Sequence, residues 1–577
     1  MNEFFVKKVK NIIDSLPKPK YDPLSILNQK ESVSSMFSLQ PVHPDVVEGI
    51  LRGLKNSKSC GVDFLDTATL KLIASEITPA LTHIINLSIR FSTFPSAWKH
   101  AKVIPLHKKG DTLDPKNYRP VAILPVLSKI LERVVFEQTV YYFEANQLFH
   151  PNHHGFRKCH NTCTALLQMF DNWVEAAEGK KVSAVCMLDM SAAFDVVNHD
   201  ILLRKLHFYG FDDNSLQWML SYLTSRTQSV CIDGSMSNPL EITTGVPQGS
   251  ILGPLSYIIY TNELPDVIFT CGNHQNPGTF SYLNNTMCSS CGSVCCFADD
   301  STLTVFGSNP ADLERKLTDK FTSISDFLTS SRLKLNEEKT NLMLMATQSK
   351  RRFSNMNIQL TTNSGIIYTS ESNKLLGAQI HQDLKWSDHI LEVVKSLNMR
   401  LNGLKNVCKH ANFKTRLMVA NGIFISKLIY LIPLWGGSSK FLINMIQVVQ
   451  NKAARYVTKK GIDEPVRELL KQCNWLSVNQ LIEYHSILTV HSTLVSSYPV
   501  YLRNKFNSDF PKNTRQATQG KLRHSVFSGA NLSLTTSSFT WRAIQSFNSL
   551  PMEIRTEKRR TKFKKAVKKW ILDSIDL

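Results

Sequence analysis

The sequence lacks any apolar run long enough to cross a bilayer, which takes about 20 consecutive apolar residues. Its first fifteen residues place Lys7, Lys8, Lys10 and Asp14 among the apolar positions, so they contain no signal-peptide core. There is no internal repeat and no long low-complexity stretch. These absences exclude repeat and membrane-spanning architectures. They predict an intracellular protein of the nucleus or cytoplasm, in which twelve cysteines do not form a disulfide framework.

What is present describes a globular protein. The 577 residues are 42% hydrophobic and 20% charged, which is ordinary for chains with a large core, and the length predicts several domains. The net charge of +20 is uneven: residues 381–577 hold 31 Lys and Arg against 12 Asp and Glu, whereas the first 380 residues hold 36 against 35. A basic block of this kind is typical of contact with a phosphate backbone. A solvated basic surface is the alternative.

The spacing of apolar residues predicts an α+β core followed by a mostly helical basic region. A short strand at 182–188 ends at Asp189, and strands at 294–297 and 302–306 flank Asp299-Asp300. Helical spacing returns beyond about residue 387. The other expected elements are helices within 45–90, a strand at 102–107, and helices at 127–142 and about 199–209.

The acidic residues at these strand ends suggest a metal site. Carboxylates at the ends of buried strands are poorly solvated unless they bind a cation, and Mg²⁺ prefers oxygen ligands. Two such ions can activate an attacking hydroxyl and stabilise the leaving oxygen in phosphoryl transfer. Asp299-Asp300 is also common turn chemistry, so the pair alone does not decide between these interpretations.

An ordered series of motifs decides it. The series is Asp189-Met-Ser-Ala-Ala-Phe-Asp195, Gly245-Val-Pro-Gln-Gly-Ser-Ile-Leu-Gly-Pro-Leu255, Phe297-Ala-Asp-Asp300, Leu335-Asn-Glu-Glu-Lys-Thr340 and Lys374-Leu-Leu-Gly377. It resembles polymerase blocks A to E of reverse transcriptases, with wording like that of LINE-type (non-LTR, jockey-like) retrotransposons. The resemblance is strong over about residues 40–390 and looser beyond.

The resemblance implies an α+β right-hand polymerase with fingers, a palm built on an antiparallel sheet, a helical thumb and a basic helical C-terminal region. The corresponding expected ranges are a lead-in at 1–40, fingers at 41–180, the palm at 181–380, the thumb at 387–460 and the C-terminal region at 461–577. The whole reverse transcriptase domain is expected at about 85–382.

Residue roles follow from the resemblance by position. Asp189, Asp299 and Asp300 match the carboxylates that bind two Mg²⁺ ions, and Lys339 matches the lysine that protonates departing pyrophosphate. Phe194 matches the steric gate against a ribose 2′-hydroxyl. The remaining matches are Gln248 and Gly249 over the nascent base pair, Leu375, Leu376 and Gly377 in the primer grip, and Lys108, Lys109 and Arg119 on the triphosphate, with the two lysines unresolved between them.

Three further positions have roles that the sequence alone does not decide. Gly155-Phe156-Arg157 resembles a template-contacting block, which gives Arg157 a nucleic-acid role, although His154 stands where the family usually has glutamine. Asp195 fits a helix N-cap at least as well as a metal ligand, and Asp200 looks like a cap of the helix that follows.

A cysteine-rich stretch lies between blocks B and C. Cys271, His274, Cys288 and Cys291 form two paired spacings separated by 13 residues, which is the arithmetic of a structural Zn²⁺ site. The family does not require zinc there, and reduced cysteines in a loop are the alternative.

The resemblance also indicates which domains usual in related proteins are not found in this sequence. About forty residues precede the finger region, too few for the endonuclease usual in this branch, and neither a CCHC knuckle nor an RNase H block is found. We therefore expect the DNA nick from elsewhere. In the tail, Phe563, Val567, Trp570 and Ile571 fall on one helical stripe, and the opposite basic face, including Lys564 and Lys565, is expected to bind nucleic acid.

The resulting hypothesis is an RNA-directed DNA polymerase that uses an RNA template, a DNA primer and deoxynucleoside triphosphates, with no membrane partner. One alternative is an intron-maturase or telomerase type of reverse transcriptase. The other is a decayed or domesticated copy that only binds RNA.

Overall fold

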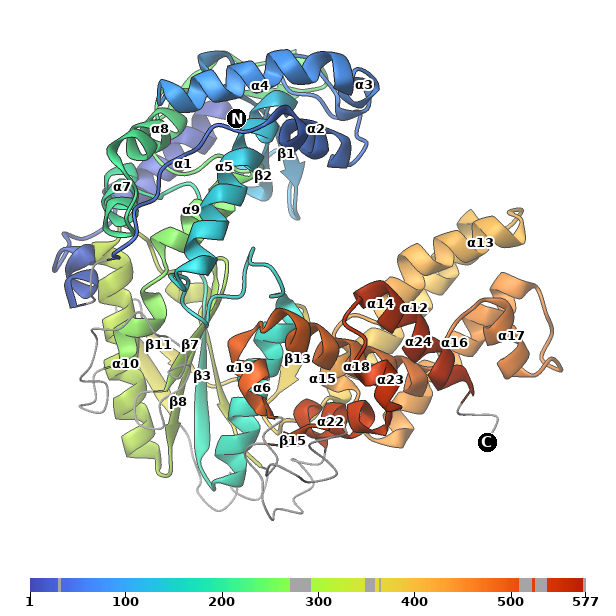
Figure 1. Cartoon of the computed structure of the whole chain (residues 1–577). Coiled ribbons are helices and arrows are strands. Elements are labelled where there is room, and N and C mark those ends of the chain that lie inside the picture. Colours follow the sequence, from blue (N-terminus) through green and yellow to red (C-terminus); the bar gives the residue numbers. More distant parts are fainter. Residues whose placement is uncertain are drawn as a thin grey trace. The chain divides into compact units, whose positions relative to one another are not determined.

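The computed structural model describes residues 1–29, 33–269, 292–347, 358–362, 365–507, 521–524 and 537–573 (Figure 1). Its contacts divide the chain into two units that interleave along the sequence. Unit 1 comprises residues 1–156, 188–301 and 319–339, and unit 2 comprises residues 157–187, 302–318 and 340–577. Among the described residues, no helix combines the length and the apolar character needed to cross a bilayer.

Unit 1 contains most of the helices of the N-terminal half and a mixed sheet. Its helices are α1 (Asn2–Asp14), η1 (Pro23–Gln29), α2 (Pro44–Gly53), α3 (Thr67–Leu72), α4 (Ala74–Arg90), η2 (Ser96–Trp98), η3 (Pro115–Asn117), α5 (Val126–Ala145), α7 (His199–Phe208), α8 (Asp213–Leu223), α9 (Leu252–Tyr260), η4 (Leu264–Ile268) and η7 (Glu337–Lys339). Its strands are β1 (His100–His107), β2 (Tyr118–Ile123), β4 (Arg226–Ile232), β5 (Ser235–Met236), β6 (Leu240–Ile242) and β7 (Ser293–Phe297).

The sheet of unit 1 has the order β2-β1-β4-β5, and β6 also pairs with β4. Strands β1 and β2 form an antiparallel hairpin in which Leu106 lies opposite Arg119. Strands β1 and β4 are parallel, with Ala101 opposite Gln228. The hairpin thereby holds Arg119 on β2, whereas Lys108 and Lys109 follow directly after the end of β1.

A second sheet has the order β7-β8-β3-β9. One boundary between the two units falls within strand β8 (Asp300–Gly307) of this sheet. Another falls within helix α10 (Pro310–Ser330), which follows β8 in the chain. Every residue of β3 (Val182–Leu188) is buried, and β3 pairs antiparallel with β9 (Asn341–Met345). A strand buried on both faces explains its continuous apolar sequence.

Unit 2 combines α6 (Thr162–Glu178) with short hairpins and a helical C-terminal half. The hairpins pair β10 (Gln359–Thr362) with β11 (Gly365–Tyr368), β12 (Ser372–Leu375) with β13 (Ala378–His381) and β14 (Phe506–Asn507) with β15 (Arg523–His524). The helices are α12 (Ser387–Val407), α13 (Phe413–Ala420), η8 (Asn421–Ile425), α14 (Ser426–Leu428), α15 (Ile432–Trp435), α16 (Lys440–Thr458), α17 (Val466–Gln472), α18 (Val478–Ser496), α19 (Val500–Lys505), α22 (Phe539–Ser549), α23 (Met552–Arg555) and α24 (Arg560–Asp573).

Buried polar contacts tie α6 to the C-terminal half of unit 2. Lys505 Nζ lies 2.5 Å from Glu175 and 3.5 Å from Asp171, and the Thr540 hydroxyl donates to Asp171 at 2.7 Å. The two carboxylates raise the pKa of Lys505 against the opposing effect of its burial. Because breaking a buried pair leaves an uncompensated charge, this cluster fixes α6 against α19 and α22.

The element types predicted from apolar spacing are confirmed. The strand at 182–188 is β3, the strand at 294–297 is β7 with one more residue, and the helix at 127–142 is α5. One local interpretation was wrong. Asn198, not Asp200, caps α7 by accepting from the Ile201 amide at 3.0 Å. Of the two alternatives for Asp195, capping does not apply to α7. Within 1–40, helix α1 was missed, although Phe5, Val9 and Ile13 repeat every four residues along it.

Candidate active site

Asp189 directly follows β3 and is held by its backbone. Its carbonyl accepts a hydrogen bond from the Asn336 amide at 2.8 Å, and the Ser191 amide donates to the Lys334 carbonyl at 2.9 Å. These bonds bring block D beside block A. Lys339 Nζ consequently lies 3.5 Å from Asp189 Oδ2, with both side chains accessible to solvent.

Asp299 lies in the turn between β7 and β8, and Asp300 is the first residue of β8. Ala298 in this turn has φ +58°, a strained conformation for a residue with a side chain. Gly155 explains how the turn is held, because a Cβ there would lie 2.5 Å from the Ala298 nitrogen. The adjacent His154 amide donates to the Cys296 carbonyl at 2.8 Å. The chain at 154–155 thus packs against the backbone of block C.

The three carboxylates influence one another electrostatically. Partial burial, then the charges of Asp299 and Asp189, raise the pKa of Asp300 to about 6. Among the described residues, no three or more His, Cys, Asp or Glu side chains surround a common metal position. The donor set is nevertheless all oxygen, as Mg²⁺ requires, and the mutual repulsion is what a bound cation would relieve.

Several cations face the same carboxylate region. Burial lowers the pKa of Lys108, and so do the nearby charges of Arg119, Lys8 and Lys339, whereas Asp189 raises it. The Lys108 amide also donates to the Asn117 carbonyl at 2.8 Å, which anchors the end of the β1–β2 hairpin. Lys8 of α1 is a member of this cluster that sequence reasoning missed. Such a group of cations suits a polyphosphate.

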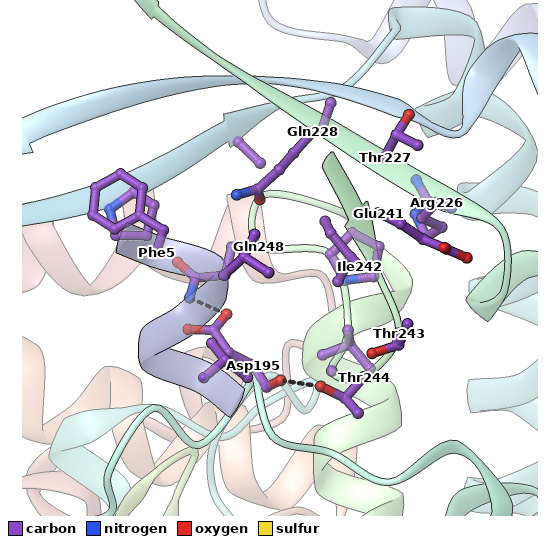
Figure 2. A pocket seen from close by; sticks show the side chains of 18 of the residues that line it. Phe5, Asp195, Arg226, Thr227, Gln228, Glu241, Ile242, Thr243, Thr244 and Gln248 are labelled. Atoms are coloured by element: carbon purple, nitrogen blue, oxygen red, sulfur yellow. Dashed lines mark hydrogen bonds between the residues drawn. The ribbon is translucent and has the colours of Figure 1, made fainter. Parts of the chain in front are cut away.

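Block B approaches block A at Gly245 and strand β2 at Gly249 so closely that glycine is required at both positions. Gly245 has φ +82°, and a Cβ there would lie 2.5 Å from the Asp195 carbonyl oxygen. Gly249 has φ +89°, and its Cβ would lie 2.4 Å from the Ala122 carbonyl oxygen. Gln248 Nε2 donates to Asp195 Oδ1 at 2.5 Å (Figure 2). Asp195 therefore orients the Gln248 amide.

Phe194 packs against a tyrosine of α9. The ring centroids of Phe194 and Tyr257 lie 4.7 Å apart at an interplanar angle of 37°. Tyr257 is fully buried, and its hydroxyl lies 3.0 Å from the Met190 sulfur. Burial and then the charge of Asp299 raise the Tyr257 pKa well above its usual value, so the hydroxyl stays protonated. Tyr257 supports both Phe194 and the residue after Asp189.

A buried carboxylate fixes the start of α9. Glu132 of α5 is fully buried and accepts the Ile251 amide at 2.7 Å and the Leu252 amide at 3.2 Å. The Ser128 hydroxyl donates to it at 2.8 Å and the Tyr222 hydroxyl at 3.3 Å. Sequence reasoning missed Glu132. The available signal was a single acidic residue among the apolar positions of the α5 pattern.

Replacing Glu132 by alanine is expected to destabilise unit 1 by roughly 3 kcal/mol, because the Ile251 and Leu252 amides lose a buried acceptor. Chemical denaturation by urea should show a lower midpoint for Glu132→Ala. The exposed Glu137 on the same helix is the matched control, and Glu137→Ala should change stability by at most about 0.5 kcal/mol. Equal midpoints for the two variants would show that other groups position α9.

Other predicted site residues belong to unit 2. Leu376 (φ +46°) and Gly377 (φ +79°) form the turn between β12 and β13, and the Tyr430 hydroxyl donates to the Leu376 carbonyl at 2.7 Å. Lys565 is exposed and Lys564 is half-buried on α24, which buries Phe563, Val567 and Ile571 as the stripe predicts. Arg157 is only 9% exposed, which leaves little of it available to a template.

The predicted zinc ligands Cys271, His274, Cys288 and Cys291 lie outside the described residues. The zinc hypothesis stays a prediction that metal analysis of the purified protein can test.

Comparison with known protein families shows which proteins this region is similar to. Residues 106–380 match the family described as reverse transcriptase (RNA-dependent DNA polymerase). This range holds all five motifs and lies inside the predicted range of 85–382. This stretch is similar to reverse transcriptase domains, and the retrotransposon polymerases described next confirm the predicted resemblance to LINE-type elements.

Individual relatives point the same way. The chain is 27% identical over 462 residues to the "Probable RNA-directed DNA polymerase from transposon BS" of Drosophila melanogaster, covering 77% of this chain and 48% of that protein. It is 26% identical over 447 residues to the "RNA-directed DNA polymerase from mobile element jockey" of the same species, covering 76% and 47%. The chain thus spans about half the length of these curated relatives.

Proposed function

We propose that this protein is an RNA-directed DNA polymerase that extends a DNA 3′-hydroxyl on an RNA template, using deoxynucleoside triphosphates. The observation that carries the proposal is the gathering, within unit 1, of three carboxylates and the cations Lys108, Arg119 and Lys339. Anionic and cationic groups side by side suit a reaction that joins metal ions to a triphosphate. The reverse transcriptase match over 106–380 supports the template and primer.

Different residues of the chain have different roles in the proposed reaction. Asp189, Asp299 and Asp300 would hold two Mg²⁺ ions, which supply activation of the primer hydroxyl and neutralisation of the leaving phosphates when bound. Lys108 and Arg119 bind the triphosphate, and Lys339 donates a proton to pyrophosphate as it departs. Gln248, oriented by Asp195, lies over the nascent base pair, and Phe194 excludes a ribose 2′-hydroxyl.

The right-hand assignment belongs to the same proposal. Residues 41–180 act as fingers, 181–380 as the palm and 387–460 as the thumb, with 461–577 as a basic nucleic-acid-binding region. The turn at Leu376-Gly377 presents backbone to the primer strand, and its tight geometry fits that task. The nick that supplies the primer comes from another protein or another part of the element.

Primer extension tests the proposal. The purified chain, given a DNA primer annealed to an RNA template, should extend it with Mg²⁺ and stop when the metal is chelated. Extension of a matched RNA primer by the same protein would favour a different polymerase class. Specific RNA binding without extension would favour the domesticated RNA-binding alternative, and use of intron RNA or a telomeric repeat alone would favour the maturase or telomerase alternatives.

The basic face of α24 should contribute to template affinity. Lys562, Lys565 and Lys569 are exposed, whereas Phe563, Val567 and Ile571 of the same helix are buried, so the lysines can be changed without disturbing the packed stripe. The triple variant to glutamine should reduce the slope of log affinity against log salt by roughly 2 to 3, at about 0.7–0.9 per lost phosphate contact. Filter binding at several salt concentrations measures it.

The matched control removes the same charge elsewhere. Lys55, Lys58 and Lys180 are exposed and belong to no proposed nucleic-acid surface, so their glutamine triple should keep the parent slope. If both triples reduce the slope equally, net charge explains the binding. If neither does, the α24 face is a solvated basic surface.

A further inference from the structure

The turn between β12 and β13 in unit 2 has an unusual backbone. Leu375 pairs with Ala378, so the turn consists of Leu376 (φ +46°) and Gly377 (φ +79°) alone. Two-residue hairpin turns with a positive φ at both positions normally carry Gly, Asn or Asp, and leucine is strained there. Within the described ranges, the amides of Leu376 and Gly377 donate to no protein acceptor. The turn therefore presents two unused donors on a strained backbone.

Tyr430 holds this turn from outside. Its hydroxyl donates to the Leu376 carbonyl at 2.7 Å and lies 3.3 Å from Thr162 Oγ1 at the start of α6. A Cβ on Gly377 would lie 3.0 Å from the Tyr430 hydroxyl oxygen, which is closer than ordinary van der Waals contact. Glycine at position 377 thus permits both the positive φ and the approach of Tyr430.

Tyr430 is itself held by two further contacts. The indole Nε1 of the fully buried Trp435 donates to the Tyr430 carbonyl at 3.0 Å. Lys427 Nζ lies over the Tyr430 ring, 5.6 Å from its centroid, where the negative face of the ring attracts a cation. Backbone and ring are both fixed in this way, so Tyr430 is a rigid support for the turn.

The body of the hairpin is stabilised without Tyr430. Leu375, Ala378 and Ile380 are buried, and the Gln379 amide donates to His389 Nδ1 at 3.2 Å. The Tyr430 hydroxyl contacts only the tip of the hairpin, at the Leu376 carbonyl. Its removal should therefore loosen the turn and leave the two strands paired.

We propose that Tyr430 is a positioning residue, which holds the Leu376-Gly377 turn so that its two amides bind a backbone phosphate of the primer strand. Successive backbone N–H groups in a turn form an anion-binding concavity, and hydrogen bonds to an ionised phosphate are stronger than neutral ones. A turn fixed in advance loses less entropy when the phosphate binds. The inference rests on the proposed polymerase function and assigns to it a residue outside the five motifs.

Primer extension by the full chain tests this inference with chemically modified primers. Each internucleotide phosphate near the 3′ end is replaced in turn by an uncharged methylphosphonate, and the KM for primer–template is measured. For the phosphate that the turn binds, the parent's KM should rise about tenfold, the loss expected for a charge-assisted hydrogen bond. Tyr430→Phe should raise the KM for the unmodified primer about threefold to tenfold, and its penalty for that same linkage should fall below about threefold.

Tyr456→Phe is the matched control, because it removes a hydroxyl of unit 2 that lies 3.3 Å from the Leu404 and Lys405 carbonyls, away from the turn. It should keep the parent's KM and the parent's linkage penalty. Both quantities are independent of the fraction of active enzyme, so partial misfolding of Tyr430→Phe cannot imitate the expected result. If Tyr430→Phe keeps the parent's primer KM and linkage penalty, this inference alone is overturned. A parent that extends no primer overturns the proposed function and this inference together.

Discussion

Asp299→Asn is expected to lower the rate of primer extension by about a thousandfold. The substitution keeps the shape of the side chain but removes one of three charges that would hold the metal ions. Loss of one preorganised electrostatic group commonly costs a hundredfold to a thousandfold in turnover, and a metal ligand sits at the upper end. Single-nucleotide extension under saturating primer–template measures the rate directly.

The controls separate loss of chemistry from loss of structure. Asp233→Asn makes the same change at an exposed turn residue between β4 and β5 and should leave extension unchanged. Asp299→Asn should retain the parent's affinity for primer–template, because the basic block at 381–577 is intact. Extension by Asp299→Asn at near-parent rate would falsify the assignment of the carboxylates.

The site residues that could be predicted from the sequence are those that lie in short contiguous motifs. Asp189 follows an apolar strand and Asp299-Asp300 separates two, so strand periodicity alone placed these carboxylates at strand ends. The β12–β13 turn was equally readable, because Gly377 adopts a positive φ that glycine tolerates. Local chemistry determines such positions, and the sequence shows local chemistry directly.

The unpredicted part depends on contacts between distant segments. Glu132 reaches the α9 amides across 119 residues of sequence, and Gly155 meets Ala298 across a comparable distance. Lys8 joins the cations around Asp189 only because α1 docks on the sheet of unit 1. Asp195 was open between capping and metal binding, but it orients Gln248. No local pattern encodes these pairings.

Helix α1 is a whole element that could not be predicted, because it depends on contacts with distant parts of the chain. Its apolar residues repeat with helical spacing, but Lys7, Lys8 and Lys10 interrupt the pattern and the following prolines suggest an irregular segment. In the structure, Phe5 packs against β1 and β4, and Lys7, Lys8 and Lys10 are exposed. The pattern was therefore that of an amphipathic helix, whose partner surface lies more than ninety residues further along the chain.

Phe194→Val is expected to raise the ratio of ribonucleotide to deoxyribonucleotide incorporation roughly tenfold to a hundredfold. In the proposed role, the Phe194 ring occupies the space that a 2′-hydroxyl would need. Forcing an extra atom into a packed site costs about 1–3 kcal/mol, and about 1.4 kcal/mol corresponds to a factor of ten. Competitive single-nucleotide extension with each triphosphate measures the ratio.

The neighbour of Phe194 supplies the control for this experiment. Tyr257→Phe keeps the ring that packs 4.7 Å from Phe194 and removes only the hydroxyl near the Met190 sulfur. It should leave the sugar ratio unchanged even if it slows extension. A rise of the ratio in Phe194→Val alone assigns discrimination to the Phe194 ring. If Phe194→Val stays active with the parent's ratio, the ring serves to pack block A against α9, and sugar selection must come from other residues.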